Sequence, residues 1–188
     1  NALLNHTDFN KIDFSNLKIT LGGGMAVQKN VAEKWLNLTG CPLNQGYGLT
    51  ETSPVASVNP LEHRQFNGSI GLPIPCTTLS IRDENGNILA RDEVGEICIQ
   101  GPQVMKGYWN RNDETKSVFH KDGALRTGDL GFMNSDGYTT IIDRKKDMIL
   151  VSGYNVYPNE IEDVIAQHPW VVEVAAIGVA HKFAGEVV

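Results

Sequence analysis

Several features that would define a function class are missing from this sequence of 188 residues. No apolar run approaches the roughly 20 residues that a membrane-spanning helix needs, so we expect no such helix within these residues. The net charge is −6 and the longest basic block is Arg144–Lys146, which gives nucleic-acid binding little electrostatic support. The three cysteines, Cys41, Cys76 and Cys98, lack metal-ligand spacing, and we interpret them as buried or free thiols in a reducing, cytoplasmic compartment.

What is present is the composition of a globular protein, with 41% hydrophobic and 20% charged residues. That apolar fraction is large enough to bury a core, which argues against disorder. The sequence begins without an initiator methionine and stops within an apolar stretch, so we expect it to be a piece of a longer protein. The five histidines have no serine or cysteine pattern typical of a nucleophile site near them, and we assign them no chemistry.

The first part of the chain, residues 1–67, is predicted to be an α/β unit. A short strand is predicted at 17–20, running into the glycines of 22–24. Apolar residues then recur every fourth position from Val27 to Trp35 with polar residues between them, which predicts an amphipathic helix. Gly40 follows at the position of a C-cap, where a left-handed residue commonly ends a helix.

Residues 68–143 have a different pattern, rich in short strands and glycines. Asn85–Gly86 lies between two short apolar runs, which is a strong hairpin signal. Ile97 and Ile99 alternate with polar neighbours in one predicted strand, and another strand is predicted at 137–143. We therefore predict a small, mostly antiparallel β-subdomain or barrel.

A further change of pattern near 143–147 marks a predicted boundary, and residues 144–188 are predicted to be a hinge and the start of a smaller α+β domain. Pro158 stands at a first helical position, and acidic residues follow where the helix dipole favours negative charge. The apolar stretch at 171–180 predicts a buried strand. The predicted fold class is mixed α/β.

Two segments near the start have residue types that suit a nucleotide. The glycines of 22–24 let a ligand approach the backbone or form a tight strand-to-helix turn, and both interpretations stay open. The run YGLTE offers an aromatic face, a bare backbone, a hydroxyl and a carboxylate, from Tyr47, Gly48, Thr50 and Glu51. Mg²⁺ is typically held by one or two carboxylates plus substrate phosphates. The alternative is a polar turn in which Thr50 caps a helix.

Two later residues suit a ribose and a phosphate. Asp129 follows Gly128 in RTGDLG, where its carboxylate can accept both hydroxyls of a ribose, with an ordinary Asx-turn as the alternative. Arg144 can clamp phosphate or ribose oxygens with its planar guanidinium. For the neighbouring Lys145 and Lys146, a solvated charge cluster at a linker is the better interpretation.

In this order the motifs resemble the acyl-adenylate-forming enzymes, which include acyl-CoA synthetases, peptide-synthetase adenylation domains and firefly luciferase. The resemblance covers roughly residues 17 to 185, through GGG, QGYGLTE, GSIGLPIP, GEICIQGPQVMKGYW, DGALRTGDLG and DRKKDMILVSGYNVYPNEIE. Within the superfamily the chain is most similar to bacterial long-chain fatty-acid–CoA ligases. The resemblance implies the C-terminal half of a large adenylate-forming domain, with its antiparallel β-subdomain, followed by the start of a C-terminal lid domain.

The resemblance also carries over a set of nucleotide-binding residues, which are Gly22, Gly23, Gly24, Gly46, Tyr47, Gly48, Thr50, Asp129 and Arg144. Within this set, Tyr47 is implied to stack on adenine and Gly48 to border the acyl carboxylate. Asp129 is implied to bind the ribose, and Arg144 the ribose or phosphate. The glycines of 22–24 are implied to line the adenine and acyl pockets.

Three residues are implied to be catalytic: Thr50, Glu51 and Arg144. Thr50 is implied to contact the α-phosphate and Glu51 to help bind Mg²⁺. Lys146 falls at the hinge of the family. Gly153 and Tyr154 match the loop that lines the tunnel for the pantetheine of CoA during thioester formation.

The implied chemistry has two steps, with ATP, Mg²⁺ and CoA as cofactors and co-substrates. A fatty carboxylate attacks the α-phosphate of ATP to give acyl-AMP and pyrophosphate, and the CoA thiol then attacks the acyl carbon and expels AMP. The phosphate loop and the catalytic lysine of the family lie outside these residues, so we expect the chain alone to be inactive. Ala124 and Arg126 depart from the DGWLHTGD form that is usual in the fatty-acid subgroup.

Three alternatives exist, and the last of them is rejected because five motifs in the order of the family are not chance. One is an adenylation enzyme for another acid, medium-chain or aryl, or one that delivers to a carrier protein. A second is a catalytically silent nucleotide- or acyl-binding relative, and a third is a structural module in which every motif is a turn. The resemblance also leaves open peripheral association with the inner membrane surface and a homodimer.

Overall fold

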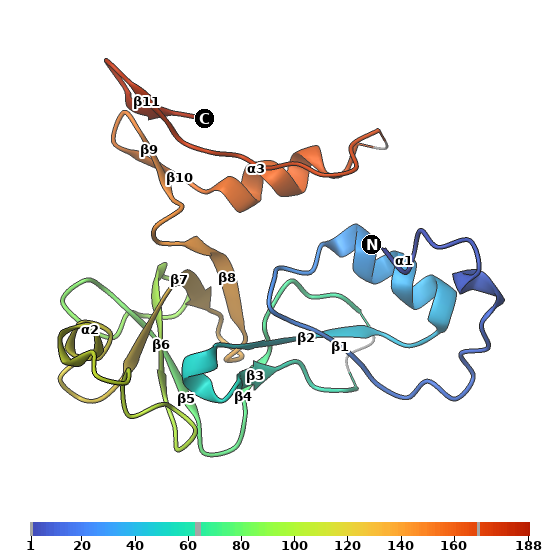
Figure 1. The fold of residues 1–188 in the computed structure, drawn as a ribbon, viewed down its shortest axis with the longest axis horizontal. Helices are drawn as coiled ribbons and strands as arrows, with labels where there is room; N and C mark the ends of the chain where they lie inside the picture. Colours follow the sequence, from blue (N-terminus) through green and yellow to red (C-terminus); the bar gives the residue numbers. More distant parts are fainter. Residues whose placement is uncertain (1, 63–64, 169) are drawn as a thin grey trace.

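The computed structural model describes residues 2–62, 65–168 and 170–188. Their strands form three sheets of four strands each (Figure 1). In that view the N-terminal part lies at the right, the part that contains α2 at the lower left, and the C-terminal part above them. The predicted mixed α/β class is confirmed.

The first sheet has the order β1-β2-β3-β4, formed by Thr20–Gly22, Leu43–Gly48, Val55–Val58 and Leu72–Pro73. β1 and β2 are parallel and are joined by α1, Lys29–Thr39, whereas the remaining pairs are antiparallel. Gly40 ends α1 in the left-handed conformation at φ 69°, and its N–H bonds to the Leu36 carbonyl, so the predicted C-cap is confirmed. Two short 3₁₀ helices complete this region: η1, Phe9–Lys11, and η2, Thr50–Thr52.

The strand predicted at 17–20 is placed too early. β1 pairs with β2 only from Thr20 to Gly22, so the first glycine of the triplet belongs to the strand. Residues 17–19 have no strand to pair with, because β2 begins at Leu43, which lies opposite Thr20.

The second sheet is antiparallel throughout, as predicted for residues 68–143, and its strands follow one another in chain order. Its strands are β5, Thr78–Arg82, β6, Gly95–Gln100, β7, Leu125–Met133, and β8, Thr139–Arg144, with the short helix α2, Asn112–Ser117, between β6 and β7. The predicted turn at Asn85–Gly86 is present, with Gly86 at φ 86°. The segment after this turn pairs with β5 at one bridge, between Arg82 and Ile88. The main partner of β5 is β6, along the whole length of β5.

The two faces of this sheet differ in chemistry, because side chains alternate along each strand. Ile97 and Ile99 face the apolar core, as their spacing predicts. The opposite face carries polar residues, yet Glu96 and Cys98 are buried as well, at 5% and 0% exposure. The alternation predicted for β6 is therefore one of chemistry and not of burial.

The hydrophobic core joins the first two sheets. Its buried members are Ala56, Ile70, Leu79, Ile81, Ile97, Ile99 and Met133. Tyr47 and Leu49, at the end of β2, pack against this cluster. Burial of each large apolar side chain stabilises the fold by about 1.5–3 kcal/mol, so the end of β2 is fixed against the second sheet.

The third sheet has the order β10-β9-β12-β11, formed by Tyr154–Val156, Ile149–Val151, Gly185–Val187 and Val179–His181. α3, Pro158–Ile165, begins with the proline as predicted. The buried strand predicted at 171–180 is wrong: only Val179 and Ala180 are in a strand, β11, and all its residues are exposed. β11 is an edge strand that pairs with β12 alone, so its apolar residues lack a covering face.

Within the described residues, no helix has the length and apolar character needed to cross a membrane.

Candidate functional site

Three of the predicted nucleotide-binding residues meet where β2, β7 and β8 approach one another. The Tyr47 hydroxyl donates to Asp129 Oδ2 at 2.5 Å, and Arg144 Nε donates to Asp129 Oδ1 at 3.3 Å. Asp129 is only 5% exposed, whereas the Arg144 side chain is 55% exposed. A buried carboxylate is thus held between a phenol and a guanidinium that reaches solvent.

The electrostatics of this cluster keep the phenol protonated. Burial of the ring raises the pKa of Tyr47, and the negative charge of Asp129 raises this pKa further. A carboxylate offers about four acceptor positions, of which Tyr47 and Arg144 take two. Asp129 therefore keeps acceptor capacity for two further donors, which is what the adjacent hydroxyls of a ribose require.

The glycine segment lies beside the same strand. Gly22 pairs with Gln45 in the parallel ladder, and a Cβ on Gly23 would stand 3.0 Å from the Gly46 carbonyl oxygen. Gly24 adopts φ 81° with open space around it. The structure therefore places the glycines of 22–24 next to the Gly46 end of β2, as a shared site requires.

Gly48 has a reason to be glycine that lies within the chain itself. A Cβ at this position would stand 1.7 Å from the Pro54 carbonyl oxygen, which no side chain can tolerate. The bare backbone of Gly48 is therefore required by the β2–β3 connection, whatever else approaches it.

Thr50 and Glu51 occupy η2, directly after β2. Capping at this turn is done by Thr52, whose hydroxyl accepts the Leu49 N–H at 2.9 Å, while Thr50 is exposed. The interpretation of Thr50 as a helix cap is therefore wrong, because Thr52 fills that role. Glu51 accepts a hydrogen bond from the Tyr108 hydroxyl at 2.7 Å, and its backbone carbonyl accepts the Met105 N–H at 2.8 Å.

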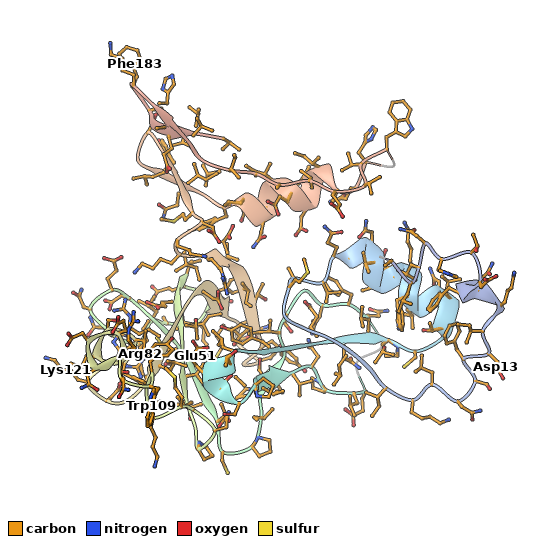
Figure 2. The ribbon with its side chains drawn as sticks, in the orientation of Figure 1. Asp13, Glu51, Arg82, Trp109, Lys121 and Phe183 are labelled. Atoms are coloured by element: carbon orange, nitrogen blue, oxygen red, sulfur yellow. The ribbon has the colours of Figure 1, made fainter. Side chains whose placement is uncertain are left out.

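Glu51 is a suitable single ligand for Mg²⁺. Across residues 2–62, 65–168 and 170–188, no three side chains of His, Cys, Asp or Glu gather where they could hold a metal. One carboxylate fits the usual Mg²⁺ site, in which substrate phosphates and water complete the shell. Figure 2 shows Glu51 in the lower part of the molecule, close to where β2 ends.

A pocket of about 350 Å³ connects Glu51 with the turn before Asp129. It is lined by Leu49, Glu51, Glu96, Tyr108, Ser117, Val118, Leu125, Arg126, Thr127 and Gly128. Acidic, basic, hydroxyl and apolar groups share the lining, so the pocket offers a ligand both polar and apolar contacts.

The remaining predicted residues lie apart from this cluster. Lys146 is exposed in the turn that follows β8. Gly153 at φ 87° and Ser152 at φ 51° form the tight turn between β9 and β10, and Tyr154 is 75% exposed. In Figure 1 this hairpin belongs to the upper part of the molecule, away from β2.

Two residues that contact the site were missed by the sequence analysis. Tyr108 bonds to Glu51, and Glu96 bonds to the turn before Asp129. Glu96 occupies a polar position in the alternation predicted for its strand, so the sequence does not distinguish it from a residue that faces solvent. Nothing in the sequence around Tyr108 indicates its partner, 57 residues away.

Comparison with known proteins agrees with this geometry. Residues 1–109 match the family described as AMP-binding enzyme, and the chain belongs to this family. It is 56% identical over 188 residues to the long-chain-fatty-acid–CoA ligase of Salmonella typhimurium, covering 100% of this chain and 33% of that protein. The chain thus spans about a third of the length of the curated relatives it matches.

Solved structures share the fold. ATP-bound MatB from Rhodopseudomonas palustris has a TM-score of 0.84 and 39% identity, covering 88% of this chain and 33% of that one. The anthranilate CoA ligase AuaEII in complex with anthranoyl-AMP has a TM-score of 0.88 and 29% identity, covering 98% and 36%. The fold predicted for this chain is confirmed as that of adenylate-forming enzymes.

Proposed function

We propose that the complete natural protein that contains these residues activates a long-chain fatty acid with ATP and transfers the acyl group to CoA. The observation that carries the proposal is the 56% identity, along the whole chain, to the long-chain-fatty-acid–CoA ligase of Salmonella typhimurium. The reaction joins the fatty carboxylate to the α-phosphate with loss of pyrophosphate, and the CoA thiol then displaces AMP. Residues 1–188 alone are expected to be inactive.

We propose that the nucleotide lies along the cluster of Tyr47, Asp129 and Arg144. The ATP and anthranoyl-AMP bound in MatB and AuaEII support a nucleotide in this fold. Asp129 would accept the ribose hydroxyls with its free acceptor positions, and Arg144 would reach ribose or phosphate oxygens from its exposed side. The adenine would stack on Tyr47, beside the glycines of 22–24.

The catalytic contribution of these residues is positioning and charge stabilisation. Thr50 would donate its hydroxyl to an α-phosphate oxygen, and Glu51 would supply one carboxylate to Mg²⁺. Bound Mg²⁺ neutralises phosphate charge in reactions of this class. Arg144 adds a fixed positive charge that stabilises the negative oxygens of the α-phosphate.

We propose that the chain divides functionally at 1–67, 68–143 and 144–188, with Lys146 at the hinge. A contact across that hinge supports a defined orientation of the last segment: Asp143 Oδ2 accepts the Asn159 N–H, at the start of α3, at 3.0 Å. Rotation of this segment would carry Gly153 and Tyr154 toward the CoA tunnel. A cytoplasmic location, peripheral association with the inner membrane surface and a homodimer are parts of the same proposal.

The test is ATP–pyrophosphate exchange by the complete protein with palmitate, octanoate, benzoate and acetate in parallel, each with and without CoA. We expect palmitate-dependent exchange and palmitoyl-CoA as the product. Exchange with another acid alone would replace the long-chain substrate by that acid. No exchange with any acid would favour a silent binding relative and contradict the proposal.

A further inference from the structure

The segment that presents Asp129 is a bulge in β7. Glu96 of β6 pairs with Leu130, and Cys98 pairs with Arg126, so the three residues 127–129 lie opposite Ile97 alone. Gly128 adopts φ 76° within this segment. Bulges bend a strand and redirect a side chain, and they recur next to active sites. Here the bulge turns Asp129 toward Tyr47 and Arg144.

Two groups on β6 hold this bulge. Glu96 Oε1 accepts the Gly128 N–H at 3.1 Å, and the Ile97 carbonyl accepts the Thr127 hydroxyl at 2.8 Å. The Thr127 hydroxyl in turn accepts the Asp129 N–H at 3.1 Å. The Gly128 and Asp129 N–H groups, which have no ladder partners on β6, are thus bonded by the side chains of Glu96 and Thr127.

The carboxylate of Glu96 accepts three hydrogen bonds within the protein. It is 5% exposed, and its Oε2 accepts Nη2 and Nε of Arg126 at 3.1 and 3.3 Å. A buried carboxylate is tolerated only when it is paired and hydrogen-bonded, and both conditions are met here. Arg126 and Gly128 take three of the about four acceptor positions of this carboxylate, so Glu96 acts by holding the backbone of the bulge, and this role needs no contact with a ligand.

We propose that Glu96 is a positioning residue for Asp129: its carboxylate fixes the 127–129 bulge and thereby sets how the site discriminates ribose hydroxyls. This inference rests on the proposed function, in which Asp129 receives the ribose. Thr127 helps to fix the same bulge, because its hydroxyl links the Ile97 carbonyl to the Asp129 N–H. Arg126, at a position where the sequence departs from its subgroup, balances the charge of Glu96.

The test is calorimetric binding of AMP, 2′-deoxy-AMP and 3′-deoxy-AMP to the complete protein and to its variants. Glu96→Ala removes the hydrogen bonds to Gly128 and Arg126, whereas Glu96→Gln keeps an acceptor for the Gly128 N–H. Thr127→Val removes the hydroxyl that links the Ile97 carbonyl to the Asp129 N–H. Glu93→Gln is the matched control, because Glu93 is an exposed residue near Glu96 whose carboxylate accepts the nearby Ala90 N–H. Circular dichroism checks that each variant is folded.

We expect Glu96→Ala to weaken AMP binding about tenfold and the deoxynucleotides much less, so that the preference for AMP falls. Glu96→Gln should lose about threefold, Thr127→Val should resemble Glu96→Ala, and Glu93→Gln should match the unsubstituted protein. If Glu96→Ala does not fold, Thr127→Val and Glu96→Gln give the same comparison.

Equal loss for all three nucleotides in the variants would mean a merely structural role and would overturn the positioning proposal while leaving the proposed function intact. Unchanged binding in Glu96→Ala and Thr127→Val would overturn it as well. No AMP binding by the unsubstituted protein would overturn the proposed function itself, and this inference with it.

Discussion

The Tyr47 hydroxyl donates a hydrogen bond of 2.5 Å to Asp129, although 82 positions separate the two residues in sequence. The bond joins the end of β2 to the bulge of β7. It links the two motifs, YGLTE and RTGDLG, that were assigned separately to adenine and ribose. The geometry of one motif therefore depends on the other, so a change in either one should alter both stability and nucleotide binding.

Tyr47→Phe keeps the aromatic face and removes the hydrogen bond. We expect the free energy of unfolding to fall by about 1–3 kcal/mol, because the buried Asp129 carboxylate loses a donor. AMP binding should weaken together with the preference over 2′-deoxy-AMP. Urea denaturation checks the first effect, with Tyr154→Phe as the control, since that side chain is 75% exposed. Equal stability of the two variants would contradict the expectation.

The same residue predicts a pH dependence at the alkaline end. Folding raises the pKa of Tyr47, mainly through burial. Above a pH of about 10 the unfolded chain loses this phenolic proton while the folded protein keeps it, so the free energy of unfolding falls as pH rises. Denaturation curves between pH 8 and about 11 should show a shallower fall for Tyr47→Phe. Parallel curves for the two proteins would argue against a buried phenol.

Arg144→Lys separates a functional role from a structural one. The Arg144 side chain is 55% exposed, so its ion pair with Asp129 should contribute under about 1 kcal/mol to stability. A lysine keeps the charge and loses the planar fork, so we expect adenylation to slow by about tenfold or more with stability nearly unchanged. Arg111→Lys, in an exposed pair with Glu114, is the control and should change neither. Equal exchange rates would remove Arg144 from the catalytic set.

Gly46 and Gly48 of β2, on either side of Tyr47, should respond very differently to substitution by alanine. Gly48→Ala places a Cβ 1.7 Å from the Pro54 carbonyl, whereas Gly46→Ala places one 3.6 Å from the Ser57 carbonyl, an ordinary contact. We expect Gly48→Ala to destabilise the protein by about 3 kcal/mol or more and Gly46→Ala by less than about 1. Thermal denaturation compares them. If Gly46→Ala is stable and binds AMP poorly, its place in the nucleotide site is supported.

The cysteines predict a simple labelling pattern. Cys76 is exposed, while Cys41 and Cys98 are buried. Burial raises the pKa of the Cys98 thiol to about 12, so its reactive thiolate is scarce near neutral pH. A thiol reagent at pH 8 should label one cysteine of the native protein rapidly, and Cys76→Ser should abolish that phase. Rapid labelling of two or three thiols would contradict the buried positions.

Local signals in the sequence predict much of the fold. Gly40 ends α1, Pro158 begins α3 and Gly86 forms its turn because each property belongs to one residue and its neighbours. The stretch 171–180 misleads because an apolar run shows what can be buried, whereas burial depends on what covers it. The edge position of β11 depends on pairing with β12, which local pattern does not specify.

The residues of the candidate site likewise fall into those that the sequence indicates and those that it does not. Tyr47, Asp129 and Arg144 were found through motifs, since their residue types suit the ligand directly. Glu96 was missed because its partner, the Gly128 N–H, lies 32 positions away and in a bulge that no residue pattern announces. Residues that act through other residues are identified only from the folded arrangement.

The proposed function requires the carboxylate of a long-chain fatty acid to attack the α-phosphate of ATP. The direct measurement is turnover by the complete protein of palmitate labelled with ¹⁸O in its carboxylate, with ATP, Mg²⁺ and CoA, followed by mass spectrometry of the products. Attack at the α-phosphate leaves one labelled oxygen on AMP after thioester formation, and we predict labelled AMP together with palmitoyl-CoA. Label in inorganic phosphate, or unlabelled AMP, would contradict the account.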